Sequence, residues 1–111
     1  MVNLMNELDS EGYLLKPEHW NKEIAITIAG LTQLTLTDEH WVIIHYLRQF
    51  YQEFPTIKIP AMRIMIKMLK EQLGAEKGNS IYFHRLFPEG LVQASKIAGL
   101  PKSAKCSKNI F

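Results

Sequence analysis

The chain has 111 residues, 47% of them hydrophobic, which is enough to bury a single core, so one compact domain is expected. A formal net charge of +2 is too small to argue for nucleic-acid binding by itself. The sequence holds no apolar run of about 18 residues, so no transmembrane helix is predicted. The polar N-terminus does not resemble a signal peptide, and with a lone cysteine this predicts a cytoplasmic protein.

The N-terminal segment is mixed, and mostly helices are expected after it. The turn signal Asp9-Ser10-Glu11-Gly12 precedes apolar residues, which is compatible with a short β-hairpin. Pro17 suits the first turn of a helix that runs to about Ala29 and ends at Gly30. The apolar stripe of this helix is formed by Trp20, Ile24 and Ile28.

The next predicted helix is the central one of the domain. Thr35 or Thr37 can cap its N-terminus, and the helix is expected to stop near Pro55. Apolar residues recur along it at steps of three and four, which is typical of a face that packs on a core. These residues are Trp41, Ile44, Leu47, Tyr51 and Phe54.

Three further helices complete the predicted domain. Pro60 opens a helix over residues 61–73 that is closed by Gly74, with Met62, Met65, Leu69 and Leu73 on one face and Arg63, Lys67 and Lys70 on another. Two short helices follow, from Asn79 or Ser80 to Phe87 and over about residues 91–98. The predicted fold is therefore mainly α, a small orthogonal domain of about five helices over residues 1–98.

A flexible C-terminal arm is expected over residues 99–111. Gly99 and Pro101 are typical of the end of a helix, and no apolar periodicity returns after them. The only cysteine, Cys106, lies on this arm, where few apolar neighbours could bury it. A thiol in this position is poorly placed for core packing and well placed to enter the pocket of another protein.

The charge around Cys106 favours its reactive form. Lys102, Lys105 and Lys108 raise the local positive potential, which should lower the pKa of the thiol below its usual value of about 8.5. The alternative interpretations are an incidental cysteine on a tail and ordinary solubilising lysines. No two histidines are spaced four residues apart, and a lone cysteine cannot supply a structural zinc site, so no metal centre is predicted.

Five short motifs resemble the TusE/DsrC family, in the family's order and without large gaps. The last one is specific, because a cysteine follows it after four residues. The motifs are Glu11-Gly12-Tyr13-Leu14, Glu39-His40-Trp41, Glu76-Lys77-Gly78-Asn79-Ser80, Arg85-Leu86-Phe87-Pro88 and Lys96-Ile97-Ala98-Gly99-Leu100-Pro101-Lys102. This resemblance implies a small helical domain whose C-terminal arm carries a reactive cysteine.

The family contains two kinds of protein, and Ser95 discriminates between them. Members of the DsrC kind, which work with dissimilatory sulfite reductase, have a second cysteine eleven residues before the terminal one. Here that position is Ser95, and a hydroxyl cannot form a persulfide or a disulfide. The chain therefore looks more like the TusE kind, although Ser103 replaces a proline of the arm and Ser107–Phe111 follow the cysteine, which is normally next to last.

Resemblance to the TusE kind implies a sulfur carrier that needs no cofactor. Cys106 would accept sulfur as a persulfide from an upstream relay complex (TusBCD). It would pass the sulfur to the enzyme MnmA, which makes 2-thiouridine at the wobble position of certain tRNAs. Two alternatives are a DsrC-like partner or regulator of sulfite reductase and a helical nucleic-acid-binding domain with an inert cysteine.

Overall fold

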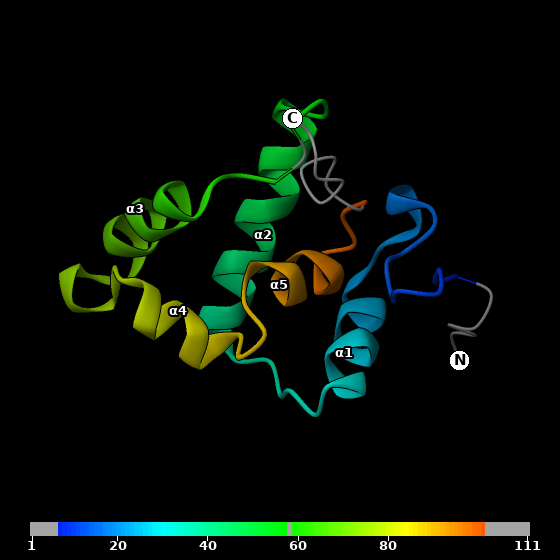
Figure 1. The fold of residues 1–111 in the computed structure, drawn as a ribbon, viewed down its shortest axis with the longest axis horizontal. Helices are drawn as coiled ribbons and strands as arrows, with labels where there is room; N and C mark the ends of the chain where they lie inside the picture. Colours follow the sequence, from blue (N-terminus) through cyan, green and yellow to red (C-terminus); the bar gives the residue numbers. More distant parts are fainter. Residues whose placement is uncertain (1–6, 58, 102–111) are drawn as a thin grey trace.

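The computed structural model describes residues 7–57 and 59–101, and the predicted mainly helical fold is confirmed (Figure 1). Short 3-10 helices at Pro17–His19 and Ala75–Lys77 supplement the α-helices. The five α-helices are α1 (Lys22–Leu31), α2 (Asp38–Glu53), α3 (Met62–Leu73), α4 (Ser80–Leu86) and α5 (Leu91–Ile97). No helix within the described ranges is both long and apolar enough to cross a bilayer.

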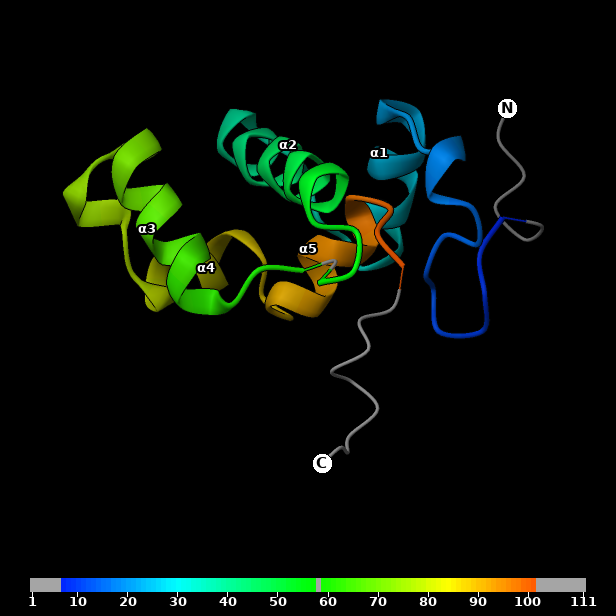
Figure 2. The same ribbon diagram turned by 90° about the horizontal axis from the view of Figure 1, so that it is seen from above.

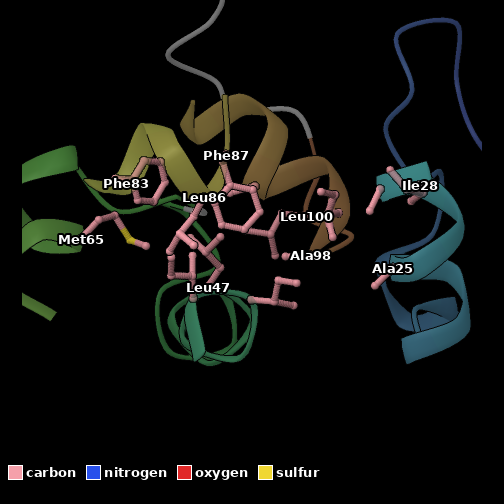
Figure 3. Packing of buried hydrophobic residues seen from close by; sticks show 14 of the residues in the cluster. Ala25, Ile28, Leu47, Met65, Phe83, Leu86, Phe87, Ala98 and Leu100 are labelled. Atoms are coloured by element: carbon pink, nitrogen blue, oxygen red, sulfur yellow. The ribbon is translucent and has the colours of Figure 1, made fainter. Parts of the chain in front are cut away.

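The short helix α5 lies at the centre of the arrangement. It contacts both α1 and α2, whereas α3 and α4 pack together on the side of α2 away from α1 (Figures 1 and 2). Figure 3 shows the core, in which Ala98 and Leu100 lie between α1 and the side chains of Leu86 and Phe87. The largest fully buried apolar side chains are Phe83, Phe87, Ile43, Ile44, Leu47, Met65, Leu69, Ile97 and Leu100.

The structure does not support the suggested N-terminal hairpin as a pair of strands. In the described part of this segment, a single antiparallel bridge joins Leu8 and Leu14. The carboxylate of Asp9 accepts the backbone N–H of Tyr13 at 3.0 Å, in place of the backbone carbonyl that a ladder would use. The segment therefore forms a bridged turn (Leu8–Leu14), with Tyr13 and Leu14 buried against the helices.

The helix predicted to begin at Pro17 is broken into two pieces. Pro17 opens the 3-10 helix, and α1 begins only at Lys22 because the Asn21 side chain caps it by accepting the N–H of Ile24 at 2.9 Å. Trp20 lies in the break between the two helices rather than on a helical stripe. This position frees its indole to reach another part of the chain.

The central helix α2 begins after Thr37, one of the two predicted caps. Its buried face is rotated from the predicted stripe toward His40 and Ile43. Phe54 lies beyond the end of the helix and is 46% exposed, so it does not belong to the core.

Candidate functional site at the root of the C-terminal arm

The predicted nucleophile and its two supporting lysines, Cys106, Lys102 and Lys105, lie outside the described residues. The structure describes the chain up to Pro101, from which the remainder of the predicted arm continues. The site is therefore built from its root, which consists of the C-terminal end of α5 and the side chains that contact it.

Helix α5 ends in a Schellman motif. Gly99 adopts a φ of +73° and donates its N–H to the carbonyl of Lys96 at 3.0 Å, while Leu100 donates to the carbonyl of Ser95 at 3.1 Å. Leu100 is fully buried and Gly99 is also buried. The packed body therefore includes the first two residues of the segment predicted as the arm.

Trp20 and Arg48 bind the next two carbonyls of the chain. The indole Nε1 of Trp20 donates to the carbonyl of Ile97 at 2.8 Å, and Nη1 of Arg48 donates to the carbonyl of Ala98 at 2.9 Å. The last carbonyls of a helix have no partners within the helix, so these two side chains satisfy groups that the Schellman motif leaves free. We call Trp20 and Arg48 together the arm-root clamp.

The two members of the arm-root clamp also hold each other. The guanidinium carbon of Arg48 lies 4.4 Å from the ring centroid of Trp20, which is a cation–π contact. A second nitrogen, Nη2, donates to the carbonyl of Pro17 at 3.3 Å and so connects α2 to the 3-10 helix. A planar guanidinium can make both hydrogen bonds and the stacking contact at once, which an ammonium group cannot do.

The charge of Arg48 suits its position at the C-terminus of α5. The exposed carbonyls of a helix C-terminus carry partial negative charge, so a cation placed there is stabilising. Burial lowers the pKa of the Arg48 guanidinium, an effect that Tyr51 partly offsets, yet an arginine stays protonated at neutral pH. The root of the arm is thus held by a permanent positive charge.

Two of the sequence motifs meet at the same end of α5. The ammonium group of Lys96 lies 5.2 Å from the ring centroid of Tyr13, which belongs to the bridged turn. Glycine suits position 12 because its φ of +93° lies in a region that residues with a side chain rarely adopt. The bridged turn and the last turn of α5 therefore form one surface beside the point where the arm leaves.

The motifs that contain Glu39 and Lys77 meet at the N-terminal end of α2. The carboxylate of Glu39 accepts hydrogen bonds from the ammonium group of Lys77 and from the hydroxyl of Tyr82. Asn79 caps α4 by accepting the N–H of Tyr82 at 2.8 Å. In addition, Gly78 lies so close to Lys70 that a Cβ would meet the lysine Cβ at 2.5 Å. These motif residues hold the connection between α3 and α4 in place, and so serve the fold.

A model of the family described as DsrC like protein matches residues 2–107, which include all five motifs and Cys106. This chain belongs to the DsrC-like protein family. It is 52% identical over 101 residues to a protein of Haemophilus influenzae described as a sulfurtransferase TusE homolog, covering 90% of this chain and 91% of that protein. It is 46% identical over 101 residues to sulfurtransferase TusE of Escherichia coli, with the same two coverages.

Solved structures of DsrC proteins share the fold of this DsrC-like chain. The NMR structure of Allochromatium vinosum DsrC superimposes with a TM-score of 0.76 at 44% identity, over 87% of this chain and 86% of that one. The crystal structure of oxidized DsrC from Archaeoglobus fulgidus, the gamma-subunit of its dissimilatory sulfite reductase, gives a TM-score of 0.80 at 36% identity, over 87% and 88% of the two chains. The family resemblance drawn from the motifs is confirmed.

Ser95 is a structural residue of this DsrC-like protein. It is fully buried in α5, and its hydroxyl donates to the carbonyl of Leu91 at 2.8 Å. With Cys106 as its only cysteine, the chain cannot form an internal disulfide. Chemistry that needs two thiols within one chain is therefore absent here.

The buried histidine His40 supports α2 rather than a metal centre. Its Nδ1 accepts the backbone N–H of Thr37 at 3.0 Å, so the proton of the neutral ring lies on Nε2, which donates to the carbonyl of Leu86 at 2.7 Å. Among the residues that the structure describes, no three histidine, cysteine or acidic side chains gather into a metal site.

His40 is expected to make the protein less stable in acid. Burial lowers the pKa of His40 from its ordinary value of 6.5, outweighing the Leu86 hydrogen bond and the charge of Glu39. The unfolded chain therefore binds a proton near pH 6.5 that the folded protein resists, so the free energy of unfolding should fall as pH drops below about 6.5. For this one proton the slope cannot exceed about 1.4 kcal/mol per pH unit.

Urea denaturation of the wild type and of His40→Gln between pH 5 and 8 measures this effect. The variant should lose the His40 contribution to the pH dependence, and the NMR signal of the His40 ring should titrate below pH 6.5 in the folded wild type. A ring that titrates above pH 6.5 would contradict the prediction.

The residue pattern predicts Trp20 on an apolar helical stripe and assigns Arg48 no particular role. A signal for Arg48 was present, because it follows Ile44 by four residues and precedes Tyr51 by three, on the predicted apolar face of α2. A cation on a face that packs on a core needs a partner there. That partner, the carbonyl of Ala98, lies fifty residues further along the chain and could not be identified from spacing.

Proposed function

We propose that this protein is a sulfur carrier of the TusE kind, in which Cys106 accepts persulfide sulfur from a TusBCD-like relay complex in the cytoplasm. It then delivers the sulfur to an MnmA-like enzyme for 2-thiolation of the wobble uridine of tRNA. The observation that carries the proposal is the 46–52% identity, over 90% of the chain, to proteins described as sulfurtransferase TusE or its homolog. Ser95, which stands where the DsrC kind has its second cysteine, supports this choice over a partner of sulfite reductase.

The transfer requires only thiol chemistry. The Cys106 thiolate attacks the outer sulfur of a donor cysteine persulfide, a new S–S bond forms, and the donor cysteine leaves as a thiolate. The proton of the persulfide stays with the transferred sulfur or is released to solvent, and no net oxidation or reduction occurs. The same exchange, run with Cys106 as the donor, passes the sulfur to the next enzyme, so no cofactor is needed.

The arm lysines would assist both exchanges. Lys102 and Lys105 lie four residues and one residue before Cys106, close enough to stabilise a thiolate or persulfide anion. They would also steer the arm toward acidic surfaces of the relay partners.

Intact-protein mass spectrometry tests the carrier role. The wild type is incubated with a cysteine desulfurase, L-cysteine and the upstream relay proteins, and the expected result is a reducible gain of about 32 Da, one sulfur atom, mapped to Cys106. Ser103→Ala serves as a control in the arm that keeps the thiol and should gain the same mass. If the wild type gained no mass while the relay loaded a control acceptor, the proposed function would be wrong.

A further inference from the structure

The arm-root clamp has a geometry that goes beyond stabilising a helix end. Trp20 comes from the break before α1 and Arg48 from the middle of α2, yet they bind two successive carbonyls, those of Ile97 and Ala98. Together with the buried side chain of Leu100, these bonds hold the last backbone units before Pro101 from three sides. The position of the backbone up to Leu100 is therefore fixed.

The length of chain after the clamp limits where the thiol can go. Cys106 lies five positions after Pro101 in the sequence, and a fully extended chain spans at most about 3.6 Å per residue. Cys106 can therefore reach no further than about 18 Å from Pro101. Because the preceding residue, Leu100, is fully buried, this limit is measured from a point next to the packed end of α5.

We propose that Trp20 and Arg48 are positioning residues for sulfur transfer, which fix the origin of the arm so that Cys106 is presented at high effective concentration to a docked partner. This inference rests on the proposed function. If the root were loose, the thiol would explore a larger volume, and its effective concentration at the partner's reacting sulfur would fall. The reactivity of the thiol itself would not change.

The charge and shape of the clamp fit this role. The planar guanidinium of Arg48 stacks on Trp20 while two of its nitrogens donate to two carbonyls, and Gly99 allows the indole to lie directly against the backbone of the turn. A Cβ at Gly99 would lie 2.4 Å from Cδ1 of Trp20. The closeness of this packing leaves little room for the root to shift.

The variants Trp20→Phe and Arg48→Lys each weaken the arm-root clamp through a conservative change of side chain. The first keeps an aromatic ring and loses the N–H donor, and the second keeps the charge and loses the planar fork. Ile44→Val is the matched control, because it lowers stability from a fully buried position one turn before Arg48 and leaves both clamp residues unchanged. Variants are compared at temperatures at which all of them are folded.

The first readout is independent of activity. Because Cys106 is the only cysteine, a nitroxide attached to it reports which backbone amides the arm visits, through the broadening of their NMR signals. In the wild type and in Ile44→Val the broadening should concentrate around the bridged turn, the 3-10 helix and the end of α5. In both clamp variants it should spread over more of the domain, and an unchanged pattern would overturn the proposal.

The second readout is single-turnover transfer from the persulfide form of Cys106 to the acceptor enzyme. The clamp variants should lose about tenfold in the rate at saturating acceptor, with little change in the acceptor concentration needed for half-maximal rate. Alkylation of Cys106 by iodoacetamide should proceed as in the wild type. An equal loss in Ile44→Val would mean that stability alone is responsible, and would overturn the positioning role.

Failure of the proposed function is distinguishable from failure of this inference. A wild type that takes no sulfur from any relay donor would refute both the carrier role and a clamp that serves it. A wild type that carries sulfur, with clamp variants that transfer it equally fast, would refute only the positioning role.

Discussion

Replacing Cys106 with alanine is expected to abolish delivery of sulfur to tRNA while leaving the stability of the protein almost unchanged. The relay consists of two exchanges at one sulfur atom, and no other side chain of this chain offers a thiol, so no residual route remains. The sequence predicts that Cys106 lies on an arm outside the core, so the effect of the substitution on the free energy of unfolding should stay within about 0.5 kcal/mol. The readouts are 2-thiouridine in tRNA, measured by mass spectrometry of digested nucleosides, and urea denaturation.

The control for this experiment is Ser107→Ala, which changes the neighbouring residue and keeps the thiol. It should support thiolation at the wild-type level. Normal thiolation by Cys106→Ala would refute the carrier mechanism, and a loss of several kcal/mol in its stability would refute the placement of the thiol on an arm.

Replacing Gly99 with alanine is expected to destabilise the fold by about 2–5 kcal/mol. The φ of +73° is strained for a residue with a side chain, and the added Cβ would meet Cδ1 of Trp20 at 2.4 Å. The indole must then move, which breaks its hydrogen bond to Ile97 and its stacking with Arg48. Because a domain of this size has a total stability of roughly 5–15 kcal/mol, the loss should be large in urea denaturation.

Gly30→Ala is the matched control for this substitution. Gly30 lies within α1, and a Cβ there would have no neighbour within 4 Å. Alanine at this position should raise stability, by up to about 1 kcal/mol, because it restricts the unfolded chain and favours the helix. Equal stability losses in the two variants would show that the close contact at Gly99 has no special role.

Local signals predicted most of the fold because they act within a few residues. The cap at Thr37, the closing Gly74, the cap at Asn79 and the turn at Gly99 all lie where the sequence indicated. The N-terminal hairpin was not supported because the Asp9 side chain competes for the N–H of Tyr13, which alternation of apolar residues does not reveal.

One part of the candidate site could be predicted from the sequence and the other part could not. Cys106 could be chosen from its neighbours and its motif alone, and it stays a prediction because it lies outside the described residues. The arm-root clamp could not be predicted, since Trp20 and Arg48 reach backbone carbonyls that are 77 and 50 residues away in the sequence. Any carbonyl could have been the partner, and only the three-dimensional arrangement selects those two.

The central position of α5 has a mechanical consequence. Under the proposed function, a partner that draws Cys106 into its own site would pull on Pro101, which follows a helix that contacts both α1 and α2. The hydrogen bonds from Trp20 and Arg48 to the carbonyls of Ile97 and Ala98 would share such a force with the elements that flank α5. Under the proposed function, the described part of the domain would keep the end of α5 in place while a partner takes up Cys106.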